Sequence, residues 1–187
     1  MSPATIPRKL KTRKRHAKGY IHTYIGDGAG KTTSALGIGL RALGNGKNVV
    51  MIQFMKGRKE IGEYQIQRLL PKYKVYQFGK VGWVSYRHPA EADKQRAKKG
   101  LAFAKKILQS RKPAHILILD EINLACGLRL LDTAEVLEML KHAQAATDVY
   151  LTGRGAPSEL LAISDFVTEI KQLKRPKRLQ ARKGIEY

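Results

Sequence analysis

A glycine-rich segment followed by lysine and threonine is the part of this sequence best suited to chemistry. It runs Gly26-Asp27-Gly28-Ala29-Gly30-Lys31-Thr32-Thr33, between a predicted strand at residues 20–25 and a predicted helix at residues 31–43. Glycines let backbone N–H groups turn inward around phosphate oxygens, and the helix N-terminus adds partial positive charge. Lys31 can contact terminal phosphates, and the Thr32 hydroxyl can bind Mg²⁺. The segment predicts a nucleotide triphosphate site; the alternative is a glycine-rich turn without a ligand.

The spacing of this loop is one residue shorter than the usual phosphate-binding pattern G-x-x-x-x-G-K-[ST]. That pattern would need glycine at position 25, where this chain has Ile25. A shorter loop cannot wrap the β-phosphate in the usual way, so we expect an altered triphosphate pose. The spacing argues against an ordinary phosphoryl-transfer NTPase.

Two adjacent carboxylates follow a buried-strand pattern later in the chain. The apolar residues 116–119 lead directly to Asp120 and Glu121. In α/β folds, ligands bind at the carboxyl ends of the strands, where such a pair would lie. Oxygen ligands suit Mg²⁺ or Mn²⁺, so Thr32, Asp120 and Glu121 are the predicted metal-binding residues. Taken alone, an apolar strand that ends in two acids is also common without a metal.

Strand-like and helix-like segments alternate along the chain from Gly19 onward. Such alternation predicts an α/β fold with a mostly parallel sheet covered by helices on both faces. With the phosphate loop, the pattern predicts the P-loop NTPase (RecA-like) class. Predicted strands cover residues 20–25, 48–54, 74–78, 115–119, 148–152 and 166–170, and predicted helices cover 31–43, 61–70, 89–110 and 132 to about 145, the last opening on Asp132.

Positive charge is concentrated at both ends of the chain, whose formal net charge is +21. Residues 1–18 contain seven lysines and arginines and no acid, and we expect a disordered arm there, followed by one domain at residues 19–187. Residues 171–187 contain seven more against one acid. These tails could bind nucleic acid or an anionic membrane, or be solvated and attract polyanions such as ATP. The N-terminal run has no interleaved aromatic residue, which favours the second interpretation.

The cysteine content and hydropathy indicate the compartment. Cys126 is the single cysteine and cannot form an internal disulfide, which agrees with a reducing cytoplasm. The longest apolar runs are far too short to span a bilayer. No apolar stretch follows the basic N-terminus, so we expect no secretory signal. The sequence therefore predicts a cytoplasmic protein without a membrane span.

Four further runs accompany the glycine-rich loop in order along the chain. They are QFMKG at 53–57, LDEIN at 119–123, LTGRGAP at 151–157 and RKGIEY at 182–187. Together with the loop, these runs resemble the ATP:corrinoid adenosyltransferases of the cobalamin-synthesis P-loop type, and the resemblance extends from Gly19 to Tyr187. It implies transfer of the 5′-deoxyadenosyl group of ATP to the reduced cobalt of a corrinoid, with release of triphosphate, in adenosylcobalamin synthesis or salvage. Cobalt(I) is itself a strong nucleophile, so no general base is needed, and none is evident.

The resemblance also implies roles for individual residues. Lys31, Thr32 and Glu121 would be catalytic, because they would orient the leaving triphosphate and stabilise its charge. The triphosphate would lie reversed relative to ordinary NTPases, which exposes the 5′ carbon. Loop residues 26–33 would bind ATP together with Arg154, a residue in a glycine-flanked turn that could instead be an ordinary surface arginine.

The corrinoid side of the site is implied to come from residues 78–84. Phe78 and Trp83 would face the corrinoid, where an aromatic ring can displace the lower axial ligand of cobalt(II); both could instead be core residues. Family members often have Phe where this chain has Trp83, and usually have Lys where it has Ala29.

The implied partners are ATP, a corrinoid, a second copy of the chain in a homodimer, and a flavin-dependent reductase or flavodoxin. Nucleic acid is not an expected partner. Three rival functions stay open at this point. They are a nucleic-acid-dependent P-loop ATPase that uses the basic tails, a nucleotide-binding regulatory module without turnover, and a small-molecule kinase that releases ADP.

Overall fold

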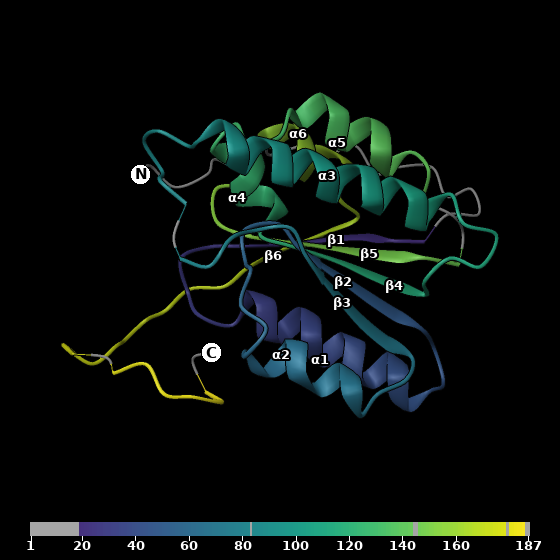
Figure 1. Cartoon of the computed structure of the whole chain (residues 1–187), viewed down its shortest axis with the longest axis horizontal. Helices are drawn as coiled ribbons and strands as arrows, with labels where there is room; N and C mark the ends of the chain where they lie inside the picture. The colour runs from purple at the N-terminus through teal and green to yellow at the C-terminus, as the bar shows by residue number, and fades with distance from the viewer. Residues whose placement is uncertain (1–18, 83, 144–145, 179, 186–187) are drawn as a thin grey trace.

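One six-stranded sheet organises the protein, whose computed structural model describes residues 19–82, 84–143, 146–178 and 180–185. All paired strands are parallel, and their order across the sheet is β3-β2-β4-β5-β1-β6 (Figure 1). The predicted α/β class with a parallel sheet is confirmed, whereas the predicted arm at 1–18 lies outside the described residues. In chain order the strands are β1 (Ile21–Ile25), β2 (Val49–Gln53), β3 (Tyr73–Gln77), β4 (Ile116–Asp120), β5 (Asp148–Thr152) and β6 (Phe166–Glu169).

Helices cover both faces of the sheet, as expected (Figure 1). One face carries α1 (Lys31–Gly44) and α2 (Gly62–Gln65), the latter continued by a 3₁₀ turn, Ile66–Arg68. The other face carries α3 (Glu91–Leu108), α4 (Ile122–Gly127), α5 (Thr133–Leu140) and α6 (Ser158–Ile163). No helix among these described residues is both long and apolar enough to cross a bilayer.

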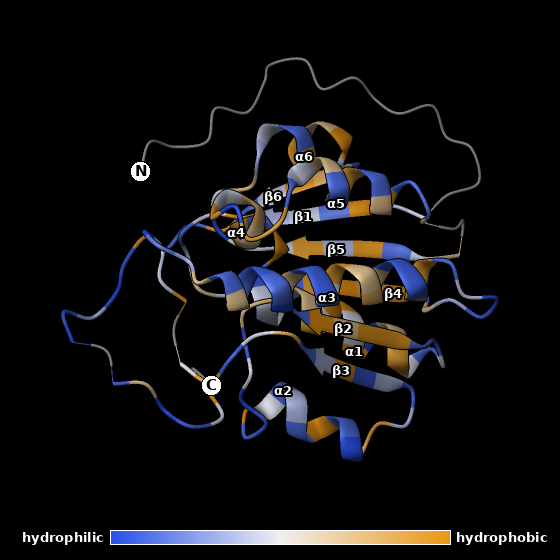
Figure 2. Cartoon of the chain, turned by 45° about the horizontal axis from the view of Figure 1, so that its top comes forward, coloured by the Kyte–Doolittle hydropathy of each residue, from blue (hydrophilic) through white to orange (hydrophobic). Residues whose placement is uncertain are grey.

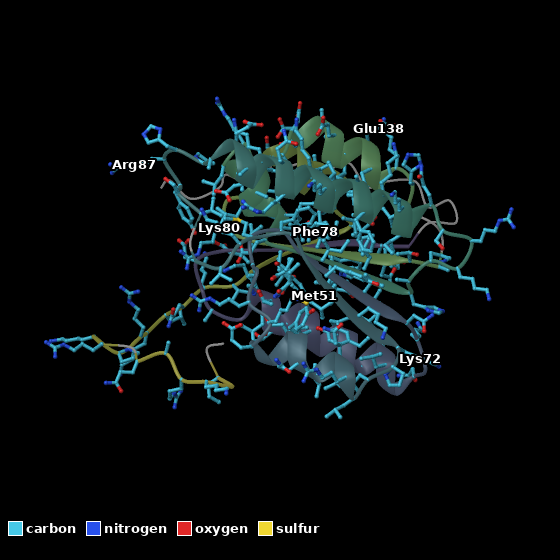
Figure 3. All side chains as sticks on the ribbon, in the orientation of Figure 1. Met51, Lys72, Phe78, Lys80, Arg87 and Glu138 are labelled. Carbon is cyan, nitrogen blue, oxygen red and sulfur yellow. The ribbon has the colours of Figure 1, made fainter. Side chains whose placement is uncertain are left out.

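The central strands are apolar on both faces, which is why they run between two helical layers. Every residue of β4 is buried, and in Figure 2 the central strands are largely orange. Leu117 and Leu119 join the core under α3 and α5. Ile118 and Met51 join the core on the α1 face, where Figure 3 labels Met51. Burial of apolar surface on both sides therefore fixes β4 and the acid at its end.

The helices differ from the sequence-based predictions both in their extent and in their number. The helix expected to about residue 145 ends at Leu140, because hydrogen bonds from His142 N to Met139 O and from Ala143 N to Leu140 O tighten the chain into 3₁₀-like turns. Its predicted cap is confirmed, since Asp132 accepts a hydrogen bond from Ala134 N at 2.8 Å. The helix expected at 61–70 is a short α-helix and a 3₁₀ turn, and α4 and α6 were not predicted.

The strand order brings distant segments to one edge of the sheet. Strand β5 lies between β1 and β4, so Thr152 at its end is placed between the glycine-rich loop and Asp120. Strand β2 is the other neighbour of β4, with Gln53 paired to Asp120 in the register. Because all strands are parallel, their carboxyl ends form one edge, and the chemistry-bearing residues lie there.

A row of stacked rings joins three strands near the outer edge of the sheet. His22 lies parallel to Tyr150 and Phe166, with ring centroids 4.4 and 4.6 Å away. Burial lowers the pKa of His22 from its ordinary 6.5, and Asp148 and Asp165 oppose this only in part. The row therefore favours the neutral imidazole.

We expect acid to weaken this row. Because the pKa of His22 is lower in the folded than in the unfolded chain, its stabilisation is complete above about pH 6.5 and is lost as pH falls through the folded value. His22→Phe keeps a stacked ring but has no proton to bind. Between about pH 7.5 and about pH 5.5, roughly one unit either side of that value, the free energy of urea unfolding should fall less for the variant than for wild type. An equal fall in the free energy of unfolding for both proteins would contradict the assignment of a neutral imidazole to His22.

Candidate active site

The glycine-rich loop turns sharply at two residues. Gly26 has φ 104° and Gly30 has φ 113°, both in the left-handed region that favours glycine. Gly30 is the N-cap of α1, and its carbonyl oxygen accepts hydrogen bonds from Ser34 N at 2.7 Å and from Thr33 Oγ1 at 3.0 Å. The predicted strand–loop–helix arrangement is therefore present, with the amino end of a 14-residue helix directed at the loop.

The Lys31 side chain is folded inside the curve of the loop. It is buried, and its Nζ donates hydrogen bonds to Gly26 O at 2.6 Å and Gly28 O at 2.8 Å. Burial lowers the pKa of Lys31, while the nearby Glu121 raises it in part and Arg154 lowers it further. The ammonium is thus held where the loop would surround phosphate oxygens.

The loop is also joined to the chain just beyond β6. Gly28 N donates a hydrogen bond to Ile170 O at 2.9 Å. A Cβ on Gly26 would lie 2.3 Å from the same oxygen, and one on Gly28 would lie 2.7 Å from it. Both glycines are therefore required for close backbone packing, and Ile170 forms the outer support of the loop.

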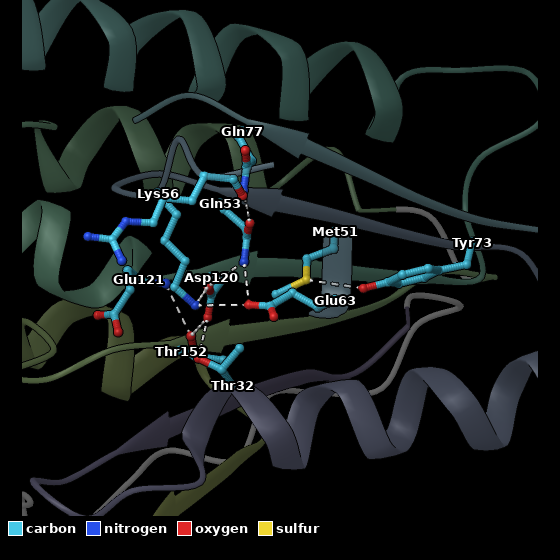
Figure 4. A network of polar contacts seen from close by, with 11 residues as sticks. Thr32, Met51, Gln53, Lys56, Glu63, Tyr73, Gln77, Asp120, Glu121 and Thr152 are labelled. Carbon is cyan, nitrogen blue, oxygen red and sulfur yellow. Dashed lines mark hydrogen bonds and ion pairs between the residues drawn. The ribbon is translucent and has the colours of Figure 1, made fainter. Parts of the chain in front are cut away.

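Asp120 is the centre of a buried polar network (Figure 4). Its Oδ1 accepts hydrogen bonds from Thr32 Oγ1 and Thr152 Oγ1, each at 2.8 Å. Its Oδ2 lies 3.0 Å from Lys56 Nζ and accepts a hydrogen bond from Gln53 Nε2 at 3.3 Å. The side chain has no exposure to solvent, so these contacts take the place of water. The structure brings the predicted Thr32 and Asp120 into direct contact.

Glu121 has a different environment from its neighbour. It lies at φ 62°, a left-handed conformation that is rare for a residue with a side chain, and it forms the N-cap of α4. Its Oε2 is buried and has no hydrogen-bond partner among the described residues. Burial raises the pKa of Glu121, and the adjacent Asp120 raises it further, against the lowering effect of Lys56. An unpartnered carboxylate oxygen held in this way is suited to a cationic ligand.

These residues fit a magnesium site that shares its ligands with a nucleotide. No group of three or more His, Cys, Asp or Glu side chains in the described part of the chain is arranged as a metal site. Mg²⁺, however, is usually bound by one or two carboxylates together with water and phosphates. The Thr32 hydroxyl, the Asp120 carboxylate it contacts and the unpartnered Glu121 Oε2 provide such a partial set.

The remaining predicted site residues are placed differently. Arg154 is exposed, close enough to influence the pKa values of Lys31 and Glu121. Phe78 is half-buried against α3, with its ring centroid 5.6 Å from that of Phe103, so it anchors its segment in the core. Trp83 lies outside the described residues.

Several members of the site were not assigned from sequence. Thr152, Gln53 and Glu63 all contact the network, yet they come from β5, β2 and α2. Lys56 follows β2 and forms an ion pair with Asp120. Thr152 lies within the sequence run at 151–157, and Gln53 and Lys56 lie within the run at 53–57, so these runs could have pointed to all three. Glu63 lies outside any motif.

The fold and site together define a P-loop nucleotide-binding protein of the α/β class. Among solved structures, the chain is similar to the crystal structure of the RadB recombinase, with a TM-score of 0.55 and 13% sequence identity over 86% of this chain and 78% of that one. At that identity the likeness concerns the fold alone.

Sequence comparison identifies the family. The family model described as ATP:corrinoid adenosyltransferase BtuR/CobO/CobP matches residues 17–187. A corrinoid adenosyltransferase from Sinorhizobium sp. is 32% identical, covering 96% of this chain and 85% of the relative. One from Pseudomonas aeruginosa is 30% identical, covering 98% and 91%. The chain belongs to the ATP:corrinoid adenosyltransferase family, so its function is ATP-dependent adenosylation of corrinoids, and the nucleic-acid-dependent ATPase is not favoured.

The packing of the loop against Ile170 gives a direct test. Gly28→Ala would place a methyl group 2.7 Å from Ile170 O, so the loop must move and ATP affinity should fall by about tenfold or more. Gly37→Ala is the matched control, because no atom lies within 4 Å of its added Cβ in α1. It should leave ATP affinity unchanged and increase stability slightly. Calorimetric titration with ATP measures both; normal affinity in Gly28→Ala would refute the packing argument.

Proposed function

We propose that residues 26–33 bind Mg·ATP with the 5′ carbon of its ribose facing the corrinoid, and that Lys31, Thr32 and Glu121 serve the adenosyl transfer. The observation that carries this proposal is the convergence at one sheet edge of the buried Lys31 ammonium, the Thr32–Asp120 contact and the unpartnered Glu121 oxygen. All of these groups act on phosphate oxygens or a cation. None is a general base placed to activate water or a hydroxyl group.

The reaction needs little acid–base chemistry from the protein. The electron pair of cobalt(I) forms the new bond to the 5′ carbon, the bond between that carbon and its oxygen breaks, and triphosphate leaves with the electron pair of the broken bond. The negative charge that develops is on the leaving oxygen. Orientation and charge stabilisation are therefore the tasks of the protein.

The charges in the site suit a triphosphate leaving group. Lys31 and the N–H groups of the loop would contact the phosphates, supported by the amino end of α1. Thr32, Asp120 and Glu121 would hold Mg²⁺ or Mn²⁺, which supplies positive charge to the leaving oxygens when bound. Arg154, exposed beside Lys31 and Glu121, is free to turn toward the nucleotide.

The corrinoid would lie on the side formed by residues 78–84. Figure 3 labels Phe78 near the middle of the view and Lys80 to its left. Phe78 packs on α3, and Lys80 Nζ lies 3.3 Å from the buried carboxylate of Asp93 in the first turn of the same helix. These contacts support an anchoring role for Phe78, and we propose Trp83 as the aromatic residue that meets the corrinoid.

The wider setting of the enzyme is also proposed from the family. We infer a cytoplasmic homodimer that uses a flavin-dependent reductase or a flavodoxin as its electron source. The division into a basic arm at 1–18 and one catalytic domain at 19–187 is part of the same proposal. The lone buried Cys126 agrees with a reducing compartment.

The direct test is an anaerobic assay with ATP, Mg²⁺ and chemically reduced cobalamin. We expect an adenosyl–cobalt product with one triphosphate released for each ATP consumed. Release of ADP would show phosphoryl transfer and refute the proposed triphosphate pose. Stimulation of phosphate release by added nucleic acid would instead support the rival ATPase.

Lys31→Ala should lower turnover by about 10²–10³-fold, because it removes a charge aimed at the leaving group. Lys47→Ala removes an exposed lysine beyond the other end of α1 and is the control, with turnover expected to stay at the wild-type level. Initial rates of adenosyl–cobalt formation compare the two. Wild-type turnover in Lys31→Ala would rule out its catalytic role.

A further inference from the structure

Lys56 lies just beyond β2, between the Asp120 network and the segment at 78–80, which belongs to the proposed corrinoid side. Its main chain forms an isolated parallel bridge with Lys80, and its carbonyl oxygen accepts a hydrogen bond from Gly79 N at 3.0 Å. A Cβ on Gly79 would lie 2.3 Å from the carbonyl carbon of Met55, so this approach requires glycine. The position of the Lys56 backbone is therefore fixed by the segment that begins at Phe78.

The side chain of Lys56 extends from this fixed point to the other side of the site. Its Nζ lies 3.0 Å from Asp120 Oδ2 and 3.3 Å from Glu63 Oε1 (Figure 4). Gln53 Nε2 donates to the same two carboxylates, at 3.3 Å to Asp120 and 3.1 Å to Glu63. With Oδ2 held by these two groups, Oδ1 of Asp120 is directed at Thr32.

The charge of Lys56 is matched to this position. Its ammonium lies within ion-pair distance of two carboxylates, those of Asp120 and Glu63, and its side chain is 33% exposed. Lys56 is the cation within ion-pair distance of Asp120 in the described part of the chain. The ammonium of Lys31 instead donates to Gly26 O and Gly28 O. Asp120 thus depends on Lys56 for its counter-charge.

We propose that Lys56 is a positioning residue that holds the Asp120 carboxylate toward Thr32 and links this arrangement to the corrinoid segment through its own main chain. The side chain acts on the metal and triphosphate side, and the carbonyl oxygen acts on Gly79. A displacement of Gly79 or of the Asp120 carboxylate is therefore transmitted to the other through Lys56. The effect of Lys56 on adenosyl transfer rests on the proposed function, whereas the pairing of Lys56 with Asp120 does not.

The pairing is tested by a double-mutant cycle on stability. Urea unfolding is measured for wild type, Lys56→Met, Asp120→Asn and the double variant. We expect Lys56→Met to lower the urea midpoint of unfolding clearly in the wild-type background. In the Asp120→Asn background the same substitution should lower the midpoint by less than about a third of that amount, because the amide needs no counter-charge. Lys59→Met, an exposed lysine nearby, should have no effect in either background. Equal effects of Lys56→Met in both backgrounds would overturn the proposal.

The positioning role is tested by separating turnover from binding. Lys56→Met should lower kcat for adenosyl–cobalt formation by about 30-fold while the calorimetric Kd for Mg·ATP changes by less than about threefold. Lys56→Arg keeps the charge and should recover kcat to within about fivefold of wild type. If Lys56→Met instead weakens ATP binding by more than about tenfold and leaves kcat intact, Lys56 is a phosphate ligand and the proposal is wrong.

The link to the corrinoid side needs a variant of its own. Gly79→Ala forces the backbone of residues 78–80 away from Met55 and Lys56, so it should weaken equilibrium binding of cobalamin. Through Lys56 it should also lower kcat for adenosyl–cobalt formation at saturating cobalamin, while the Kd for Mg·ATP changes by less than about threefold. A wild-type kcat at saturating cobalamin would refute the link. If wild type itself releases no triphosphate, the proposed function fails, and the unfolding cycle still decides whether Lys56 holds Asp120.

Discussion

The structure depends on one constraint, which is that the Asp120 carboxylate is completely removed from water. An unpaired carboxylate in such a place costs on the order of several kcal/mol, so it must be surrounded by donors. The donors come from α1, β2, β5 and the segment after β2, through Thr32, Gln53, Thr152 and Lys56. The start of α1, strands β2 and β5, and the segment that bridges to Lys80 are therefore held together around one side chain.

The two adjacent acids, Asp120 and Glu121, differ in how the protein surrounds them. Both oxygens of Asp120 have partners within the protein, so this carboxylate stabilises the framework of the site as well as facing Thr32. Glu121 is held in a left-handed conformation, typically a cost of about 1–3 kcal/mol, and keeps one buried oxygen without a partner among the described residues. Such a cost persists only where the surrounding structure imposes it. The fold thus supplies partners for both oxygens of the first acid and leaves one oxygen of the second without a partner among the described residues.

The parts that could be predicted from sequence are those determined by local pattern. The loop at 26–33, the apolar strand before Asp120 and the alternation of strands and helices all depend on neighbouring residues, and the resulting α/β class is confirmed. The contributions of Lys56, Glu63 and Thr152 could not be derived in this way, because they depend on strand order and on a short helix with no clear periodicity. Helices α4 and α6, with six residues each, are too short to show a helical repeat.

The hydrogen bond from Gly28 to Ile170 makes the glycine-rich loop depend on the edge of the sheet. The loop follows β1, whereas its supporting carbonyl follows β6, the edge strand whose neighbour in the described sheet is β1. If β6 separates from β1, the loop loses its outer support while the central strands stay paired. A local opening at this edge would therefore reshape the phosphate-binding loop without unfolding the rest of the domain.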